Sequence, residues 1–199
     1  EVMTGFGRTG RWFGVDHWGV RPDVLTSGKG STSGYFPFGL TACSGEVFEA
    51  VREHGFVHGF TWSHNGVGAA VAHAALRRLQ DGGLVEASAR QGERLLKSLS
   101  SALADEPSVG DVRGIGLMVG VELVADRASK APFPRALQAT ERVVAAAREA
   151  GLLLYSSTGH VDGRDGDLVM LGPPFVISDE ECDLVVDRTA AAIASLRPA

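Results

Sequence analysis

The sequence predicts a mixed α/β protein in two parts, and three observations support this fold class. A β-branched and apolar run, Val24–Thr26, leads directly into the glycine-flanked Lys29, as at the end of a buried strand in an α/β sheet. Two helical patterns then follow one another. From Val109 onward strand and helix patterns alternate, which is typical of a small α+β domain. We therefore expect two parts, residues 1–84 and residues 85–199, of which the second forms a small α+β domain.

The first part opens with residues 1–4, which we expect to be the tail of a strand. Gly5–Gly10 then fits the pattern G-x-G-x-x-G, so a dinucleotide-binding loop has to be considered. Such a loop requires a helix that begins at its third glycine. The next stretch, residues 11–22, contains two glycines and a proline and has no helical apolar spacing. A nucleotide site is therefore disfavoured, and a glycine-rich loop without a ligand remains an alternative.

The stretch around Lys29 is the most informative one in the first part. Glycine occupies both neighbouring positions, and Gly34 follows. Glycine on both sides of a lysine would let a flat cofactor approach the backbone. An amine that is held at a strand end and partly removed from water can be neutral enough to form a Schiff base with an aldehyde. A solvated turn lysine is the alternative interpretation of this stretch alone.

Four further elements lead from the first part into the second. Leu40–Cys43 is expected to form a short buried strand, and Gly45–His54 a helix. Apolar residues at i, i+3 and i+4 with an alanine-rich face predict a closely packed helix over Val67–Leu79, ending near Gly82-Gly83. A second amphipathic helix is expected from Leu84 to about Ala104. The leucines on one side of that helix are Leu95, Leu99 and Leu103.

The second part has a mixed pattern. Val112–Val124 alternates between apolar and polar residues and is predicted to be a strand. Ala136–Ala150 is predicted to be a helix, and short strands are expected at 152–155 and 168–171. The glycine-rich and charged stretch 159–166 between them is predicted to be a loop.

A final amphipathic helix is expected to run towards Leu196. Ser178 stands before it at the N-cap position, where a hydroxyl accepts a hydrogen bond from a free backbone N–H. Three acidic residues, 179–181, then occupy the first turn and complement the helix dipole.

Composition narrows the class of protein. Of the 199 residues, 44% are hydrophobic and 22% are charged, as in an ordinary globular protein. The formal net charge of −5 and the lack of a basic stripe argue against nucleic acid or an anionic membrane as a partner. We expect no membrane anchor, because the longest apolar stretch is too short to cross a bilayer, and no signal peptide.

The cysteines and histidines predict neither a disulfide framework nor a metal site. Cys43 and Cys182 lie far apart in the sequence without a ligand spacing, and we interpret both as buried free thiols of a reducing compartment, hence a cytoplasmic protein. His54 and His58 have the spacing of a metal pair. Glycines interrupt any helix there, and no third ligand is evident, so no metal is expected.

Several motifs in a fixed order resemble one known family. They are Glu1–Gly10, His17–Asp23, Lys29-Gly30, Gly34–Gly39, His58–Thr61, Val112–Leu123 and Pro173–Ser178. In order and spacing they resemble the class III aminotransferases, which are pyridoxal 5'-phosphate (PLP) enzymes of fold type I. The resemblance covers nearly the whole chain and implies that residues 1–84 are the C-terminal part of the large PLP-binding domain. It also implies transfer of an amino group between an amine or amino acid and a keto acid or aldehyde.

The resemblance implies roles for individual residues. Lys29 matches the Schiff-base lysine, which also acts as general base, and Val2 matches the residue that packs on one face of the cofactor ring. Thr61 matches the threonine that binds the cofactor phosphate across the subunit interface, so a homodimer is expected. The run after it, His64–Gly66, departs from the family's Gly-His-Pro, and His64 therefore inherits no role. A plain helix-entry role for Thr61 remains an alternative.

Two arginines are candidates for holding a substrate carboxylate, because a guanidinium binds a carboxylate through two hydrogen bonds. They are Arg113 and Arg164. Arg164 precedes Pro173-Pro174 near the place where some relatives carry a mobile substrate arginine, although its spacing departs from theirs. Arg8 in the glycine loop is an alternative interface residue.

The resemblance places several required groups upstream of Glu1. These are the aspartate that pairs with the PLP ring nitrogen, the aromatic residue that stacks on the ring and most of the phosphate-binding loop. We therefore expect the chain alone not to transaminate. Two alternatives remain open: a non-catalytic fragment or structural subunit that needs a partner chain, and a PLP-dependent aminomutase, racemase or decarboxylase of the same family.

Overall fold

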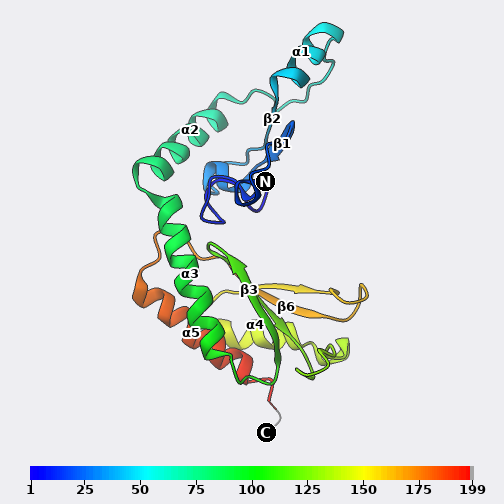
Figure 1. Cartoon of the computed structure of the whole chain (residues 1–199), viewed down its shortest axis with the longest axis vertical. Helices are drawn as coiled ribbons and strands as arrows, with labels where there is room; N and C mark the ends of the chain where they lie inside the picture. Colours follow the sequence, from blue (N-terminus) through cyan, green and yellow to red (C-terminus); the bar gives the residue numbers. More distant parts are fainter. Residues whose placement is uncertain (198–199) are drawn as a thin grey trace. The chain divides into compact units, whose positions relative to one another are not determined.

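The structure, a computed structural model, describes residues 1–197 (Figure 1). The chain divides into two compact units, Glu1–Ser88 and Ala89–Ala199. Helix α3 (Leu84–Ala102) contains the boundary between them.

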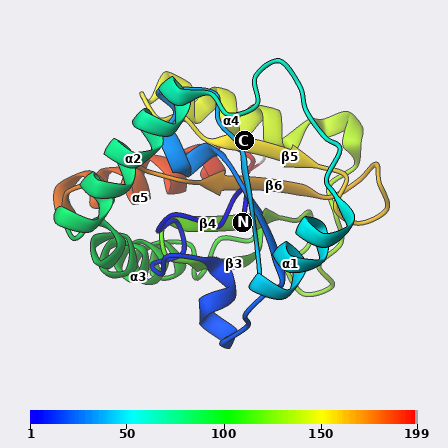
Figure 2. The ribbon, with the colours of Figure 1, turned by 90° about the horizontal axis from the view of Figure 1, so that it is seen from above.

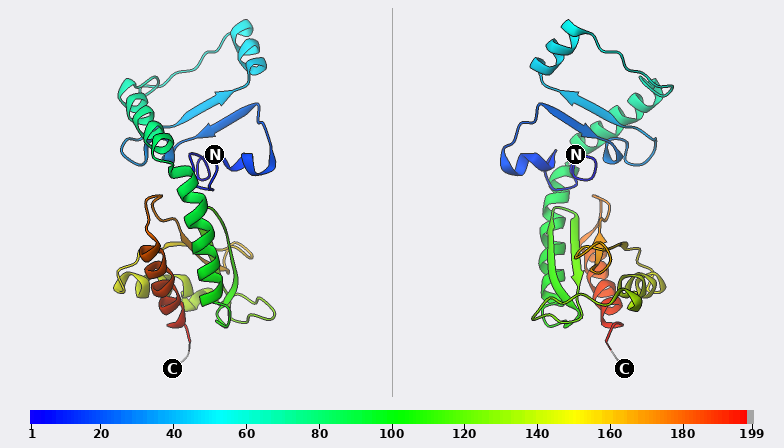
Figure 3. Two further views of the ribbon diagram at one scale, coloured as in Figure 1. Left: turned by 60° about the vertical axis from the view of Figure 1, so that its left-hand side comes forward. Right: turned by 90° about the vertical axis from the view of Figure 1, so that its right-hand side faces the viewer.

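The first unit contains an antiparallel ribbon of two strands, β1 (Val24–Ser27) and β2 (Leu40–Cys43), visible in Figure 3. Val24 pairs with Cys43, and Ser27 pairs with Leu40. Both strands were predicted, but the prediction that they are buried is wrong, since Val24 is 51% exposed and β2 lies largely in water. A buried strand needs neighbours on both sides and cover on both faces, whereas each of these strands has one neighbour.

The glycine-rich N-terminal stretch folds into turns, so the strand tail expected at residues 1–4 is absent. The N–H of Gly5 donates to the Glu1 carbonyl at 3.0 Å and closes the first turn. Two short 3-10 helices follow, η1 (Gly14–Trp18) and η2 (Lys29–Thr32). The chain after Gly10 continues in bends rather than opening an α-helix. A dinucleotide-binding loop, disfavoured from the sequence, also lacks the helix that it would require.

Two helices complete the first unit and confirm the predictions for these stretches. Helix α1 spans Gly45–His54, and α2 spans Gly66–Asp81. Helix α2 packs against η2, and its Gly68 lies against Phe36 and Phe38 of the loop after η2. A Cβ added at Gly68 would lie 2.8 Å from the Phe38 ring. The absent side chain therefore lets α2 seat the segment that carries Lys29.

The second unit is built on an antiparallel sheet in the order β3-β4-β6-β5, which Figure 2 shows from above. The strands are β3 (Val109–Ile115), β4 (Met118–Leu123), β5 (Tyr155–Thr158) and β6 (Asp167–Leu171). The single strand predicted over 112–124 is wrong, because a two-residue turn at Gly116 (φ 55°) folds it into the β3–β4 hairpin. The strand expected at 152–155 begins only at Tyr155, and the predicted loop at 159–166 is confirmed.

Helices α3, α4 (Ala139–Glu149) and α5 (Asp179–Ala194) contribute to one core with the sheet. The helix-facing side chains of β4 are fully buried, and so are the three leucines predicted on one side of α3. The residues concerned are Val119, Val121, Leu123, Leu95, Leu99 and Leu103. The alternation of β4 and the leucine spacing of α3 thus place one apolar face of each element in the core.

The ends of α4 and α5 show how side chains define helix starts. The helix predicted from residue 136 begins at Ala139, because Gln138 has φ 52° and separates it from a 3-10 turn, η3 (Arg135–Leu137). Buried Asp167 of β6 accepts hydrogen bonds from the N–H and hydroxyl of Thr140, at 3.1 and 2.7 Å. Helix α5 begins as predicted: Ser178 and Glu181 form a reciprocal capping box.

Both cysteines are free thiols, and Cys182 is buried as predicted. Cys43 is exposed, so the prediction of two buried thiols is wrong for it, because its strand β2 lies on the surface. Within residues 1–197 we find no helix with the length and apolar character that crossing a membrane requires.

Candidate active site around Lys29

Lys29 stands where strand β1 ends, and its backbone is held in an unusual conformation. It is the first residue of η2, after Gly28, and has φ 41°. A positive φ is uncommon for a residue with a side chain and persists where the surroundings fix it. Here the N–H of Ser31 donates to the Gly28 carbonyl at 3.0 Å, and the buried Thr32 hydroxyl donates to the Phe36 carbonyl at 2.6 Å.

The glycines beside Lys29 serve close packing within the protein. A Cβ at Gly28 would lie 3.2 Å from the Phe38 carbonyl oxygen, and one at Gly30 would lie 3.4 Å from both the Gly5 carbonyl and the Phe6 Cβ. The sequence interpretation was that these glycines admit a flat cofactor. In the structure, the protein's own backbone occupies that space, because the Lys29 loop lies against the glycine loop on one side and Phe38 on the other.

The side chain of Lys29 is exposed, and its Nζ contacts the thioether sulfur of Met3. A thioether is a weak acceptor, and among residues 1–197 no carboxylate forms an ion pair with this amine. The sequence interpretation of a partly desolvated amine is therefore wrong for the described chain. What the structure does provide is an amine at a fixed backbone position whose donors are not occupied by an acid.

Val2 and Thr61 are both accessible. Val2 is 46% exposed and precedes Met3, the residue that contacts the Lys29 amine. Thr61 lies in an exposed turn between α1 and α2. The helix-entry alternative for Thr61 is wrong, because Asn65 caps α2 and accepts a hydrogen bond from the Gly68 N–H at 2.9 Å.

The two arginine candidates belong to the second unit. Arg113 lies on β3 opposite Gly120, and its guanidinium pairs with Asp111 at 2.8 Å and with Glu122 at 3.5 Å. The hydrogen bond that Arg113 donates to the Asp111 carboxylate, although opposed by partial burial, raises the pKa of Arg113. Arg164 is exposed in the β5–β6 loop, where its N–H donates to the Asp162 carboxylate at 2.8 Å. Arg113 therefore already has carboxylate partners.

A residue that sequence reasoning did not single out, Glu1, joins the turns around Lys29. Its carboxylate accepts hydrogen bonds from the Thr4 hydroxyl at 2.6 Å and from the N–H groups of Gly14 and Val15 at 2.8 and 3.0 Å. Burial alone would raise the pKa of Glu1, whereas these three hydrogen bonds lower it, and the net shift is downward. Its carbonyl also accepts a hydrogen bond from the Ser27 hydroxyl at 2.8 Å.

Three side chains around Lys29 were therefore missed: Glu1, Met3 and Phe6. The Phe6 ring is 5% exposed and meets the Phe13 ring edge-on, with centroids 5.5 Å apart. Their spacing in the sequence carries no signal for these contacts, because they join turns whose course depends on glycine conformations. Arg8 of the same loop is partly buried, which lowers its pKa, and its carbonyl accepts a hydrogen bond from Ser88 at 3.3 Å.

The donor set suits a carbonyl cofactor better than a metal. Lysine is a poor metal ligand at neutral pH but forms imines with aldehydes. Within residues 1–197, no cluster of three or more His, Cys, Asp or Glu side chains is arranged to hold a metal ion. An accessible amine that contacts Met3, with the exposed apolar Val2 next to Met3 in the chain, therefore fits an aldehyde cofactor with an apolar ring face.

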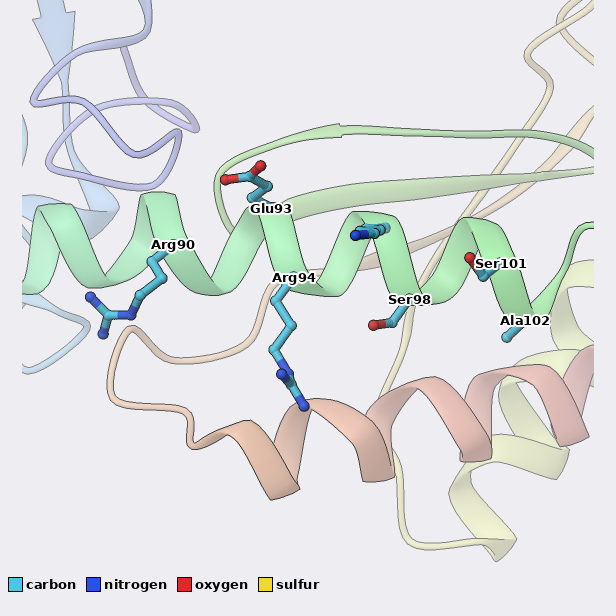
Figure 4. A pocket seen from close by; sticks show the side chains of 7 residues that line it. Arg90, Glu93, Arg94, Ser98, Ser101 and Ala102 are labelled. Carbon is cyan, nitrogen blue, oxygen red and sulfur yellow. The ribbon is translucent and has the colours of Figure 1, made fainter.

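A separate hollow lies along α3 in the second unit (Figure 4). Arg94 extends from it to α5, where its guanidinium binds both carboxylate oxygens of Asp183 at 2.8 Å and approaches Asp179 at 3.5 Å. Hydrogen bonding to Asp183 raises the pKa of Arg94. Because its central cation is paired across the two helices, this hollow is a helix contact and not a second candidate site.

Comparison with known proteins gives a consistent result. The profile of the family described as "Aminotransferase class-III" matches residues 1–193. An uncharacterised aminotransferase of Bacillus subtilis is 36% identical over 98% of this chain and 45% of its own length. The taurine–pyruvate aminotransferase of Bilophila wadsworthia is 35% identical over 94% of this chain and 41% of its own length.

Solved structures agree with the sequence comparison. The crystal structure of a transaminase from the marine bacterium Virgibacillus matches with a TM-score of 0.92 and 39% identity, covering 98% of this chain and 44% of that one. The chain thus spans less than half the length of the curated relatives and solved structures described here.

Proposed function

The chain belongs to the class III aminotransferases, and from that premise we propose that it is the C-terminal portion of a PLP-dependent transaminase. The observation that carries the proposal is the setting of Lys29. This lysine follows a strand, is held at φ 41°, and presents an amine that no carboxylate of residues 1–197 pairs with. A solubilising surface lysine would gain nothing from such a backbone.

In this proposal, Lys29 has two tasks. It would hold the cofactor covalently through its amine, and it would then remove the proton from the substrate Cα and return a proton at the end of the transfer. PLP, when bound, supplies an electron sink for the negative charge that develops at that carbon. Val2 would cover one face of the ring with its exposed apolar side chain. We further propose that residues 1–84 form the C-terminal part of the large PLP-binding domain and that residues 85–199 form the small domain.

The proposed substrates are an amine or amino acid as donor and a keto acid or aldehyde as acceptor. The taurine–pyruvate relative supports a keto acid acceptor, because that enzyme's name specifies pyruvate. Arg164 and Arg113 are the proposed carboxylate-binding residues. Arg113 would first have to leave Asp111 and Glu122, whereas Arg164 lies in an exposed loop. Thr61 is proposed to serve the cofactor of the second subunit in a homodimer.

The test uses the full-length gene product that contains these residues, because the relatives are more than twice as long as this chain. The protein is incubated with PLP, reduced with borohydride and digested, and the modified lysine is located by mass spectrometry. The chain offers two internal comparisons, since its other lysines are Lys97 and Lys130. We expect the modification on Lys29 and amine-dependent consumption of pyruvate or another keto acid.

Matched variants complete the test. Lys29→Ala should remove both the trapped cofactor and the transamination, and Lys97→Ala, a change on the exposed side of α3, should remove neither. Equal modification of all three lysines, or full transamination by Lys29→Ala, would contradict the proposal. If the cofactor is trapped on Lys29 but the protein racemises or decarboxylates its substrate without amino transfer, the protein catalyses another reaction of the same family.

A further inference from the structure

The segment that carries Lys29 contacts other parts of the first unit on both of its sides. Glu1 makes the contact before the lysine directly and is linked through Phe13 and Phe6 to the contact after it. Before Lys29, the Ser27 hydroxyl donates to the Glu1 carbonyl at 2.8 Å, and the Glu1 main-chain nitrogen donates to the Thr26 carbonyl at 2.9 Å. Strand β1 is thus attached to the backbone of Glu1 two and three residues before the lysine.

The second contact runs through the Glu1 side chain. Its carboxylate binds the N–H groups of Gly14 and Val15 at 2.8 and 3.0 Å and so caps the first turn of η1. Phe13 directly precedes this capped turn. Its N–H donates to the Asp16 carboxylate at 2.9 Å, and its ring meets the Phe6 ring edge-on. Phe6 in turn lies directly against Gly30, the residue after Lys29.

Two glycines, Gly14 and Gly5, pack closely against Glu1. A Cβ at Gly14 would lie 3.3 Å from the Glu1 carboxylate and 3.0 Å from Thr4, so any larger residue at position 14 would push against both groups. A Cβ at Gly5 would lie 2.7 Å from the Glu1 carbonyl. Both glycines therefore serve the close approach of their loops to Glu1.

We propose that Glu1 is a positioning residue for Lys29: it fixes the strand before the lysine through its backbone and the Phe6 support after it through its carboxylate. The proposal rests on the proposed function in that Lys29 is the residue whose position matters. Glu1 itself touches neither substrate nor cofactor in this account. Its effect is to keep the Lys29 backbone at its positive φ and the amine at one place.

The first arm of the test measures the position of the Lys29 segment without cofactor. Hydrogen exchange of residues 24–32 is compared by mass spectrometry in the full-length wild-type protein and in Glu1→Gln, which keeps the shape but replaces one acceptor oxygen by an NH₂ group. Glu53→Gln is the matched control, because Glu53 is an exposed glutamate of the same unit. We expect exchange in this segment to become roughly tenfold faster in Glu1→Gln, as for loss of a hydrogen bond to a charged group, and to stay unchanged in the control.

The second arm measures the amine. The PLP concentration that gives half-maximal borohydride trapping on Lys29 should rise about tenfold in Glu1→Gln, with an intermediate value in Glu1→Asp, which keeps the charge. Unchanged exchange and unchanged trapping in Glu1→Gln would overturn the proposal. So would equally faster exchange throughout the first unit, because Glu1 would then be a general stabilising residue.

The two arms separate this proposal from the proposed function. Wild-type protein that traps no cofactor on Lys29 would refute the function, whatever the Glu1 variants do. A local exchange response in residues 24–32 would still support the positioning of the segment by Glu1. The arms therefore fail independently.

Discussion

Gly92 of helix α3 lies directly against Gly116 in the turn of the β3–β4 hairpin. A Cβ built at position 92 would come within 2.1 Å of the Gly116 carbonyl carbon and 2.2 Å of its oxygen. These atoms belong to the backbone of a tight turn, so no flexible side chain can move aside. The contact brings the hairpin turn onto α3, next to Leu95 and the buried Leu117 in the core of the second unit.

We expect Gly92→Ala to destabilise the second unit despite the better helix propensity of alanine. The added methyl group would separate α3 from the hairpin, and overpacking of this kind costs about 1–3 kcal/mol, occasionally more, against a propensity gain of about 1 kcal/mol. Urea unfolding followed by far-ultraviolet circular dichroism measures the change. Gly66→Ala is the control, since a Cβ there meets nothing within 4 Å; equal stability of Gly92→Ala and wild type would refute the contact.

Ser178→Ala should weaken the start of α5. The Ser178 hydroxyl accepts the Glu181 N–H at 3.2 Å, and the Glu181 carboxylate accepts the Ser178 N–H at 2.9 Å. Loss of such an N-cap costs about 1 kcal/mol. The free energy of unfolding should therefore fall by that amount, and amide exchange should quicken in the first turn of α5. Ser100→Ala, on the exposed side of α3, should leave both values unchanged; a larger effect there would contradict the cap.

The two thiols should differ strongly in reactivity. Cys43 is exposed, whereas Cys182 is 1% exposed and lies 3.6 Å from the Gln91 side-chain oxygen. Burial raises the pKa of the Cys182 thiol, so less of the reactive thiolate is present at neutral pH. Iodoacetamide on the native protein should modify Cys43 first, and Cys182 only after unfolding in urea. Equal native labelling of both, read by mass spectrometry, would show that Cys182 is not buried.

The Glu1 network should respond to acid. Because hydrogen bonds lower the pKa of Glu1 in the folded chain relative to its ordinary value of 4.5, its stabilising effect is complete above about pH 4.5 and is lost as the pH falls through the lower folded value. Tryptophan fluorescence, with Trp12 and Trp18 near this loop, should change in that range in wild type. The same transition in Glu1→Gln would assign it to another carboxyl group.

If Thr61 serves the cofactor of the second subunit, two inactive variants should restore one another. A heterodimer of Lys29→Ala and Thr61→Ala subunits has one doubly defective site and one intact site. Random mixing should then recover about a quarter of the wild-type activity, since half of the twofold dimers are mixed. Native mass spectrometry verifies that heterodimers form. Verified heterodimers without recovered activity would place Thr61 at its own subunit's cofactor, or at none.

Much of the secondary structure could be predicted from the pattern of residues close together in the sequence. The bounds of α1, the leucine face of α3 and the Ser178–Glu181 cap each depend on residues within a few positions of one another. Short-range spacing of this kind is read directly from a sequence. The hairpin at Gly116 was missed because alternation continues on both sides of a two-residue turn, and nothing in the alternation itself marks the reversal.

The sequence by itself determined the family, through motifs in a fixed order, and with it the candidate lysine. Only the tertiary structure decided what surrounds that lysine. The exposure of β1 and Cys43 could not be predicted, because burial depends on which other segments cover a strand. The hydrogen bonds that Glu1 accepts from Gly14, Val15 and Ser27 join residues separated by 13 or more positions, and so does the contact between Gly92 and Gly116. Such contacts depend on backbone turns at several glycines. Each glycine can adopt many backbone conformations, and only packing in the folded protein selects one of them.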